Sequence, residues 1–449
     1  MSEALAGSLR ALLGRDDGTV EALHRLSGGA SRETWSFDLV VDGTRRPLIL
    51  QRLRPGAGAS STGVSIDVEA DLLRLASSHG VPVAAVVADD PGTVLGSAGM
   101  VVERIEGETI ARKLLRDDEW STARTRLGTQ VAGALAAIHA IPPEAARGLA
   151  PIDQLGQLRG LLDGLGEPHP AFELGIRWLG AHRPPGVAPR VVHGDFRLGN
   201  LLVDHAGLAA VLDWELAHLG DPDEDLGWFC VRAWRFGSPL PAGGVTTREE
   251  LLAAYEAASG RRVDPEALRW WELLGTLKWG VICILQAWGH LSGASRSVEL
   301  ATIGRRVCEN EWDVLGLLPG APLVAHPART GAASPVLHDR PRLSELVEAV
   351  REWVDGDVRE GTEGRLSFHA RVAANALRMV ERELALGPEP AFAHAERLRA
   401  LGCADDVELA TKVRSGELDD RAEEVRAAVA ASVNDKLLVA NPSWLELDG

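Results

Sequence analysis

The amino-acid sequence predicts an α+β fold with a small antiparallel sheet near the N-terminus, a mostly helical middle and a helical tail. Residues 22–55 alternate apolar and polar side chains between turn signals, as strands do. Apolar positions with helical spacing dominate residues 108–318 and return beyond residue 336. A chain of 449 residues is too long for one core of ordinary size. We therefore expect an N-terminal lobe, a helical lobe, a linker and a helical domain, at residues 1–107, 108–318, 319–335 and 336–449.

Composition and charge narrow the class of protein. The 64 acidic and 47 basic residues give a formal charge of −17, which argues against binding to the phosphate backbone of nucleic acid. The four cysteines are widely separated and form no zinc or disulfide pattern, as expected in a reducing cytoplasm. The N-terminus lacks a signal-peptide pattern, and no apolar run is long enough to span a bilayer. We expect a cytoplasmic protein with no nucleic-acid or membrane partner.

The elements of the N-terminal lobe follow from turn signals and periodicity. Strand patterns flank a hairpin turn at Asp42-Gly43, and the second of them runs from Pro47 to Leu53. Residues 65–79 carry apolar side chains at helical spacing. Two more strand patterns, "VPVAAVVAD" and "GMVVERIEG", complete the predicted sheet.

Beyond residue 107, the pattern is helical with one interruption. Periodic segments predict helices over 121–140, 171–181, 248–259 and 268–291. Short apolar runs between residues 191 and 212, separated by turn residues, predict small strands and a hairpin. The Pro-, Ala- and Gly-rich segment 319–335 predicts the linker. The tail shows three amphipathic helices, around 343–354, 373–384 and 425–437.

The interruption contains the stretch "VVHGDFRLGNLLVD", residues 191–204, in which polar residues stand between apolar flanks. His193, Asp195 and Asn200 fit the pattern H-x-D-x-x-x-x-N, and Asp213 ends the next hairpin. Four residues between Asp195 and Asn200 let a loop curl so that both face one space, and the hairpin returns Asp213 beside Asn200. This order and spacing are typical of a kinase catalytic loop.

Each residue type suits phosphoryl transfer. Asp195 would accept the proton of a substrate hydroxyl, while Asn200 and Asp213 would supply hard oxygen ligands for Mg²⁺. Arg197 would stabilise charge on the transferring group or serve as a structural charge, and the sequence leaves both roles open. His193 is expected to brace the loop. The alternative interpretation of the acids and the amide is that they only cap turns.

The stretches "HGDFRLGN", "LDWE" and "GDPDEDL" resemble the aminoglycoside phosphotransferase and choline kinase group of small-molecule kinases. The resemblance covers about residues 20–318 and implies a bilobal, protein-kinase-like fold. Through "LSGGASRETW" and "MVVERIEG" the chain most resembles kinases associated with acyl-CoA dehydrogenases, and its tail resembles an uncharacterised helical domain appended to such kinases. By the same resemblance, Asp225 would tie down the catalytic loop.

This resemblance implies nucleotide-binding positions in the N-terminal lobe. The turn with Gly28, Gly29 and Ser31 would cover the ATP phosphates, although a plain hairpin turn remains an alternative. The backbone near Glu103 and Ile105 would bind the adenine as a hinge.

The third strand, "LILQRLRP", lacks the lysine that a kinase uses to hold the α- and β-phosphates. Gln51 occupies the expected register, whereas Arg52 supplies a fixed cation, and alternation lets only one of them face the cleft. Glu69 is the candidate helix partner of that basic group, with a solvated helix face as the alternative.

Together these features predict an ATP- and Mg²⁺-dependent O-phosphotransferase of a small hydroxylated metabolite. The resemblance implies a hydroxyacyl-CoA or hydroxy acid as the acceptor, with an aminoglycoside or other antibiotic as the alternative. The missing strand lysine motivates a different class, a catalytically weak nucleotide-binding regulator. The amphipathic tail is expected to form a homodimer or to bind a protein partner.

Overall fold

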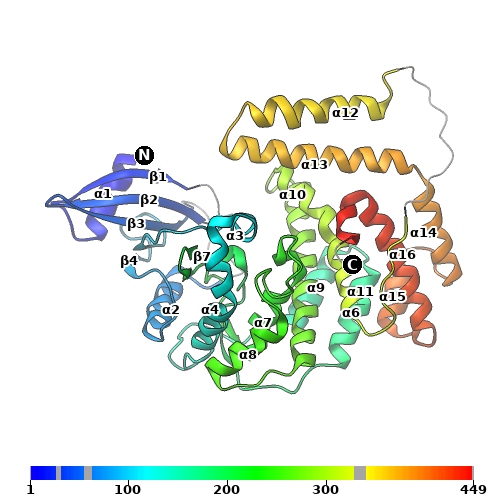
Figure 1. Cartoon of the computed structure of the whole chain (residues 1–449), viewed down its shortest axis with the longest axis horizontal. Coiled ribbons are helices and arrows are strands. Elements are labelled where there is room, and N and C mark those ends of the chain that lie inside the picture. The colour runs from blue at the N-terminus through cyan, green and yellow to red at the C-terminus, as the bar shows by residue number, and fades with distance from the viewer. Residues whose placement is uncertain (1, 27–31, 55–62, 328–339, 447–449) are drawn as a thin grey trace. The chain divides into compact units, whose positions relative to one another are not determined.

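The N-terminal part of the chain folds into a five-stranded antiparallel sheet, as the sequence predicts (Figure 1). The computed structural model describes residues 2–26, 32–54, 63–327 and 340–446. Neighbouring strands in the order β1-β2-β3-β5-β4 are all antiparallel. The strands are β1 (Thr19–Arg25), β2 (Arg32–Val41), β3 (Thr44–Leu53), β4 (Val86–Asp90) and β5 (Gly99–Glu103).

The hairpin between β2 and β3 confirms the predicted turn. Val41 pairs with Thr44, so Asp42 and Gly43 form a two-residue loop, and their φ angles are +49° and +75°. Two consecutive positive φ angles match the right-handed twist of the flanking strands, and Asp-Gly adopts them readily. The turn fixes the register of β3 against β2.

Helices cover both faces of this sheet. Helix α1 (Ser2–Leu12), which the sequence analysis did not anticipate, buries Leu9 in one apolar cluster with Leu50 of β3. Helix α2 (Ile66–Ser78) buries Ile66 in a second cluster with Met100 of β5. Adjacent residues of β3 and β5 belong to different clusters because side chains alternate across a sheet.

The chain divides into two compact units, and the sheet belongs to the first, residues 1–152 with 184–272. Two short antiparallel strand pairs in this unit carry the predicted motif, and a large apolar core surrounds them. The pairs are β6 (Arg190–Val192) with β9 (His218–Gly220), and β7 (Leu201–Asp204) with β8 (Gly207–Val211). The helices of this unit after α2 are α3 (Ala111–Arg116), α4 (Ser121–His139), α7 (Asp223–Cys230) and α8 (Arg248–Ser259), followed by the start of α9 (Pro265–Leu291).

The second unit, residues 153–183 with 273–449, is helical throughout its described part. In it, tail helices α15 and α16 pack on α6, and α16 also packs on α11. The division into four domains expected from the sequence stays a prediction. Besides the rest of α9, the helices are α5 (Gln154–Leu165), α6 (Pro170–Ala181), α10 (Val298–Ile303), α11 (Val307–Leu317), α12 (Leu343–Trp353), α13 (Gly364–Leu386), α14 (Glu389–Ala400), α15 (Asp406–Ser415) and α16 (Ala422–Ala440).

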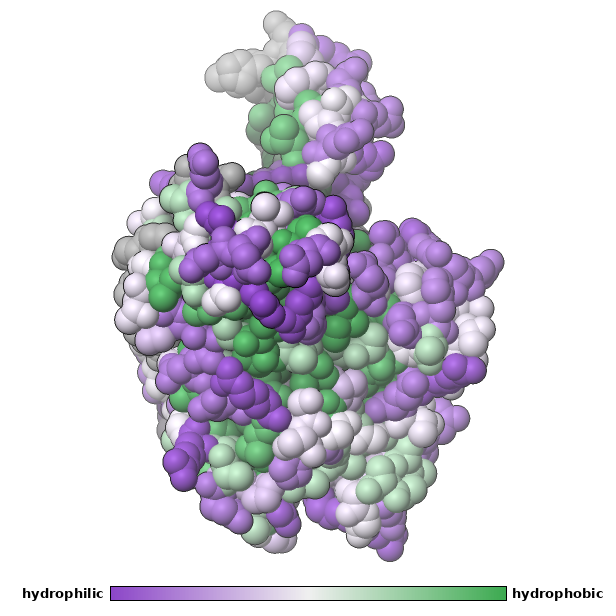
Figure 2. Space-filling model, turned by 90° about the vertical axis from the view of Figure 1, so that its left-hand side faces the viewer, coloured by the Kyte–Doolittle hydropathy of each residue, from purple (hydrophilic) through white to green (hydrophobic). Residues whose placement is uncertain are grey.

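The α+β class is thereby confirmed, with an antiparallel sheet followed by helices and an all-helical tail. Hydrophilic side chains cover much of the face shown in Figure 2, in keeping with 64 acidic and 47 basic residues. Where the structure describes the chain, no helix combines the length and the apolar character needed to cross a membrane.

Candidate functional site

The predicted catalytic motif lies in the loop that joins β6 to β7. Phe196 and Leu198 are fully buried in this loop and alternate with Asp195 and Arg197, whose side chains are 14% and 26% exposed. The apolar residues anchor the loop in the core, so the polar side chains between them are directed out of it. The local sequence therefore fixes both the position and the direction of the functional groups.

Asp195 and Asn200 are in direct contact. The side-chain nitrogen of Asn200 donates to the backbone oxygen of Asp195 at 2.9 Å and to its Oδ2 at 2.7 Å. Because both contacts use the amide nitrogen, the amide oxygen of Asn200 remains as a ligand for a hard cation. The geometry suits the metal-binding role that the sequence predicts for this residue.

Two further donors hold the other carboxylate oxygen of Asp195. Arg197 Nε lies 3.1 Å from Oδ1, and Trp228 Nε1 donates to the same atom at 2.8 Å. The guanidinium of Arg197 also lies 4.9 Å from the ring centre of Trp234. Trp228 is a site residue that the sequence analysis missed, and no local spacing marks it because it lies 33 residues beyond Asp195.

Asp213 joins this group from the end of the β7–β8 hairpin. Leu212 donates its backbone N–H to the backbone oxygen of Asn200 at 2.8 Å, which aligns the two segments. Asp213 itself has φ of +63°, in the left-handed region that few residues other than glycine adopt. The structure thus brings Asp195, Asn200 and Asp213 together, as their spacing predicts.

Negative charge accumulates around Asp213. Burial, as the largest cause, and the nearby carboxylates of Glu215, Asp195 and Glu69 together raise the pKa of its carboxyl to about 7. A divalent cation would relieve this crowding, and the donors are the oxygen atoms that Mg²⁺ prefers. Within the described ranges, no three His, Cys, Asp or Glu side chains are arranged to hold a metal ion. One amide and one carboxylate would leave the other coordination positions to phosphate and water.

Two buried residues brace the catalytic loop. His193 is fully buried, and its Nε2 lies 3.0 Å from the backbone oxygen of Leu212, which links the loop to the hairpin. Burial lowers the pKa of His193, so its ring is a neutral hydrogen-bonding group. Asp225, at the start of α7, accepts the backbone N–H groups of His193 and Gly194. Both residues hold the loop in the manner expected from the sequence.

The expected partner of Glu69 requires a correction. Glu69 lies on α2 with its side chain 3% exposed, and it forms an ion pair with Arg32 of β2 rather than with Arg52 of β3. Arg52 instead donates to Glu33 at 3.1 and 3.0 Å. The physical reason is strand alternation, because Arg52 shares its face of β3 with Leu50, in the cluster that α1 covers.

Gln51 points to the opposite face of β3 from Arg52. It pairs in register with Thr34 of β2 and shares its face with Ile49, which packs in the same cluster as α2. Of the two candidates left open by the sequence, Gln51 therefore faces α2. At this position β3 presents no cation to α2, because Gln51 is uncharged; Arg45, six residues earlier on the same strand, is paired with Asp38 and Glu21.

The other predicted nucleotide-binding positions are the hinge residues Glu103 and Ile105 and the turn with Gly28, Gly29 and Ser31. Glu103 is the last residue of β5 and pairs with Leu48, and its carboxylate accepts from Arg46 Nε at 2.8 Å. Ile105 follows in the segment that reaches β7, where Glu108 and Val203 exchange backbone hydrogen bonds of 2.8 and 3.0 Å. The predicted phosphate-binding turn, with Gly28, Gly29 and Ser31, lies outside the described residues.

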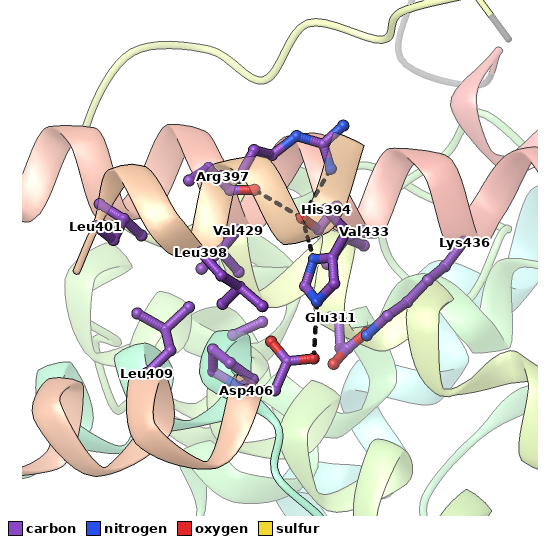
Figure 3. Close-up of a pocket in the computed structure, with 14 residues that line it drawn as sticks. Glu311, His394, Arg397, Leu398, Leu401, Asp406, Leu409, Val429, Val433 and Lys436 are labelled. Carbon is purple, nitrogen blue, oxygen red and sulfur yellow. Dashed lines mark hydrogen bonds and ion pairs between the residues drawn. The ribbon is translucent and has the colours of Figure 1, made fainter. Parts of the chain in front are cut away.

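The second unit contains a separate small cavity of about 20 Å³, lined by none of the predicted site residues (Figure 3). Its polar lining groups contact one another: His394 lies 3.2 Å from Asp406, and Lys436 lies 3.2 Å from Glu311. Ser432 Oγ lies 2.9 Å from the His394 ring. The cavity lies where tail helices meet α6 and α11, and its charged groups compensate each other within the packing of this unit.

Two parts of the chain match known protein families. Residues 22–271 match the phosphotransferase enzyme family APH, and residues 360–444 match DUF6285, a domain of unknown function. The chain is 28% identical over 278 residues to acyl-CoA dehydrogenase family member 10 of Mus musculus, covering 56% of this chain and 25% of that protein. It is 25% identical over 244 residues to member 11 of the same organism, covering 49% of this chain and 30% of that protein. The chain thus spans less than a third of the length of either relative.

Comparison with solved structures shows which fold the chain adopts. A putative aminoglycoside phosphotransferase from Ralstonia eutropha JMP134 superposes with a TM-score of 0.56 at 23% sequence identity, covering 70% of this chain and 98% of that one. The kinase-like fold, the helical tail and the assignment as a small-molecule kinase, expected from the sequence, are thereby confirmed. The family match covers more than half of the 449 residues, and the chain belongs to the APH phosphotransferase enzyme family.

Proposed function

We propose that this protein is an ATP- and Mg²⁺-dependent O-phosphotransferase that phosphorylates the hydroxyl group of a small metabolite. The observation that carries the proposal is the convergence of Asp195, Asn200 and Asp213, with an amide–carboxylate contact of 2.7 Å between the first two. Phosphoryl transfer depends mainly on positioning and on neutralising charge, and these three side chains supply both.

The roles follow from the contacts. Asp195 accepts the proton of the acceptor hydroxyl as the new oxygen–phosphorus bond forms and the bond to the departing ADP breaks. Asn200 and Asp213 would hold Mg²⁺, which when bound would supply positive charge to neutralise the phosphates. Arg197, fixed between Asp195 and Trp234, balances charge on the transferring group.

The acceptor that we favour is a hydroxy acid or a hydroxyacyl-CoA. Arg197 brings a positive charge to the base, and the rings of Trp228 and Trp234 lie 5.1 Å apart beside it. The guanidinium of Arg197 would offer one attractive contact to the carboxylate or phosphate groups of such an acceptor. The similarity to two proteins named as acyl-CoA dehydrogenase family members supports the same acceptors.

The test is ATP turnover with separate pools of hydroxy acids, hydroxyacyl-CoAs and aminoglycosides. We expect phosphorylation in one of the first two pools, and we expect Asp195→Asn to abolish it. Asp71→Asn is the matched control, because Asp71 is a carboxylate on α2 with a side chain 78% exposed. Turnover that survives Asp195→Asn unchanged would exclude Asp195 as the base. Turnover confined to aminoglycosides would show that the acceptor is an aminoglycoside and not a hydroxy acid or hydroxyacyl-CoA.

A regulator that binds nucleotide without transferring phosphate is the second candidate, because β3 has Gln51 where a kinase has lysine. This candidate predicts that Mg²⁺ and ATP raise the melting temperature while no acceptor pool is phosphorylated. The contacts of Asp195 with Asn200 and Trp228 argue against it, since a regulator has no need of a positioned base.

The tail carries a separate proposal, a surface for a second copy of the chain or for another protein. Helix α12 supports it, because Leu343, Leu346, Val350 and Trp353 are all at least half exposed. Light scattering before and after Leu346→Asp with Val350→Asp tests the proposal. An unchanged mass that is already that of a monomer would rule out the homodimer.

A further inference from the structure

On the face of β3 that α2 covers, the position of the usual kinase lysine holds the uncharged Gln51, and Arg45 at the other end of the strand is paired with Asp38 and Glu21. Gln51 and Ile49 lie on this face, whereas Arg52 lies on the other with Leu50. The guanidinium of Arg52 is held away from α2 by its two bonds to Glu33. If the protein binds a nucleoside triphosphate, the cation that meets the phosphates must come from another element.

Arg32 reaches the position that β3 leaves uncharged. It is the first residue of β2, and alternation puts it on the same face as Thr34, which lies opposite Gln51. Its Nη1 forms the ion pair with Glu69 Oε2, and its Nε lies 3.5 Å from Glu215 Oε2. The side chain is only 12% exposed, so it is held inside the site rather than in solvent.

Two carboxylates from different segments position this guanidinium. Glu69 comes from α2, and Glu215 follows Asp213 by two residues, so Arg32 lies beside the group of carboxylates that would attract a cation. A guanidinium carries five N–H groups in a planar fork, and these two contacts leave donors for phosphate oxygens. The predicted phosphate-binding turn, residues 28–31, directly precedes Arg32 in the sequence.

We propose that Arg32, held by Glu69, is the phosphate-binding cation of the nucleotide site and takes the role that a lysine of the third strand has in other kinases. This inference rests on the proposed function, because it assigns a residue to the nucleotide of that reaction. Arg32 would bind the triphosphate through charge-assisted hydrogen bonds, and Glu69 would keep its side chain extended toward the phosphates.

The test compares the binding of ATP and of adenosine to the full chain by titration calorimetry in the presence of Mg²⁺. Arg32→Gln should weaken ATP binding by about tenfold or more, since a charged hydrogen-bonding group is lost, and should leave adenosine binding unchanged. Retained adenosine binding shows that the site is still folded. Arg32→Lys should restore part of the ATP affinity, because it returns the charge without the planar fork. Arg74→Gln is the matched control, because Arg74 is also paired with carboxylates near α2 but is 43% exposed.

The outcomes separate this inference from the proposed function. Wild-type protein that binds neither ATP nor adenosine would overturn both. Normal ATP binding by Arg32→Gln would overturn only the role of Arg32 and would not affect the proposed phosphotransferase function. Loss of ATP affinity in Arg52→Gln but not in Arg32→Gln would return the role to β3. A merely structural Arg32 predicts equal losses for ATP and adenosine, which would also overturn the proposal.

Discussion

Asp225 accepts the backbone N–H of His193 at 2.7 Å, although 32 residues separate them in the chain. Its second oxygen accepts the N–H of Gly194 at 2.9 Å, and His139 Nε2 lies 3.2 Å from the first. The carboxylate is completely buried. One side chain at the start of α7 thus fixes the loop that presents Asp195, the proposed catalytic base.

Asp225→Asn should impair catalysis more than substrate binding. The amide would turn its NH₂ group toward one of the N–H donors, so a buried donor would lose its acceptor at a cost of about 2 kcal/mol. A displacement of Asp195 by the relaxed loop should lower kcat by about a hundredfold, with a smaller change in KM. Steady-state kinetics and thermal denaturation check this. An unchanged kcat would show that the loop holds its geometry without Asp225.

Trp228→Phe should lower kcat by about tenfold, because Asp195 Oδ1 loses a hydrogen bond to a charged group worth about 1.5 kcal/mol. The phenyl ring keeps most of the packing against Trp234. Trp120→Phe is the matched control, since Trp120 is also buried but its indole N–H has no partner among the described residues. Equal losses of kcat in the two variants would assign the effect to packing.

The catalytic loop could be predicted from the sequence because its geometry is local. Asp195, Asn200 and Asp213 belong to one loop and one hairpin, so their spacing alone brings them together. The helices over 121–140 and 268–291 were predictable for a similar reason, since apolar residues that recur at helical spacing over a long segment predict a helix from the local sequence alone.

The features that the sequence did not predict depend on tertiary packing. Arg32 and Glu69 are 37 residues apart in the sequence. Their pairing could be predicted only if it were known which face of β2 packs against α2. Trp228 is marked as a site residue only by its contact with Asp195. Helices α1, α14 and α15 were also not anticipated from the sequence.

The pairing of Glu311 with Lys436 should make the second unit sensitive to acid. Burial would raise the pKa of Glu311, but Lys436 and His169 outweigh it and lower this pKa to about 2. The pKa in the folded protein lies below the usual glutamate value of 4.5, so the stabilisation is complete above pH 4.5 and is lost as the pH falls toward 2. Because Lys436 is 46% exposed, we discount the contribution to about 2 kcal/mol.

Urea denaturation of wild type and Glu311→Gln at several pH values tests this. The wild type should be more stable at pH 7, and the difference should shrink below pH 4.5 as Glu311 becomes protonated. Lys436→Met should destabilise the unit because it leaves a buried carboxylate uncompensated, and adding Glu311→Gln should recover part of the loss. A stability difference that does not depend on pH would contradict the assignment.

Two glycines in helices should respond in opposite ways to replacement by alanine. Gly227 lies in α7, between Asp225 and Trp228, and a Cβ there would approach the Cβ and carbonyl carbon of Trp271 to 2.5 and 2.6 Å. These atoms belong to another helix and cannot move aside cheaply, so Gly227→Ala should destabilise the fold by about 2 to 3 kcal/mol. Gly133 lies in α4 with nothing within 4 Å of its Cβ position, so Gly133→Ala should stabilise the fold by about 0.5 to 1 kcal/mol.

The same pair tests whether α7 positions the catalytic loop. Displacement of α7 by Gly227→Ala moves Asp225, which holds the loop backbone, and Trp228, which holds the Asp195 carboxylate. Activity measured well below the melting temperature should therefore fall in Gly227→Ala even where the protein remains folded, and should be unchanged in Gly133→Ala. Full activity of folded Gly227→Ala would show that the loop tolerates a shift of α7, and the positioning role would then rest on the hydrogen bonds of Asp225 alone.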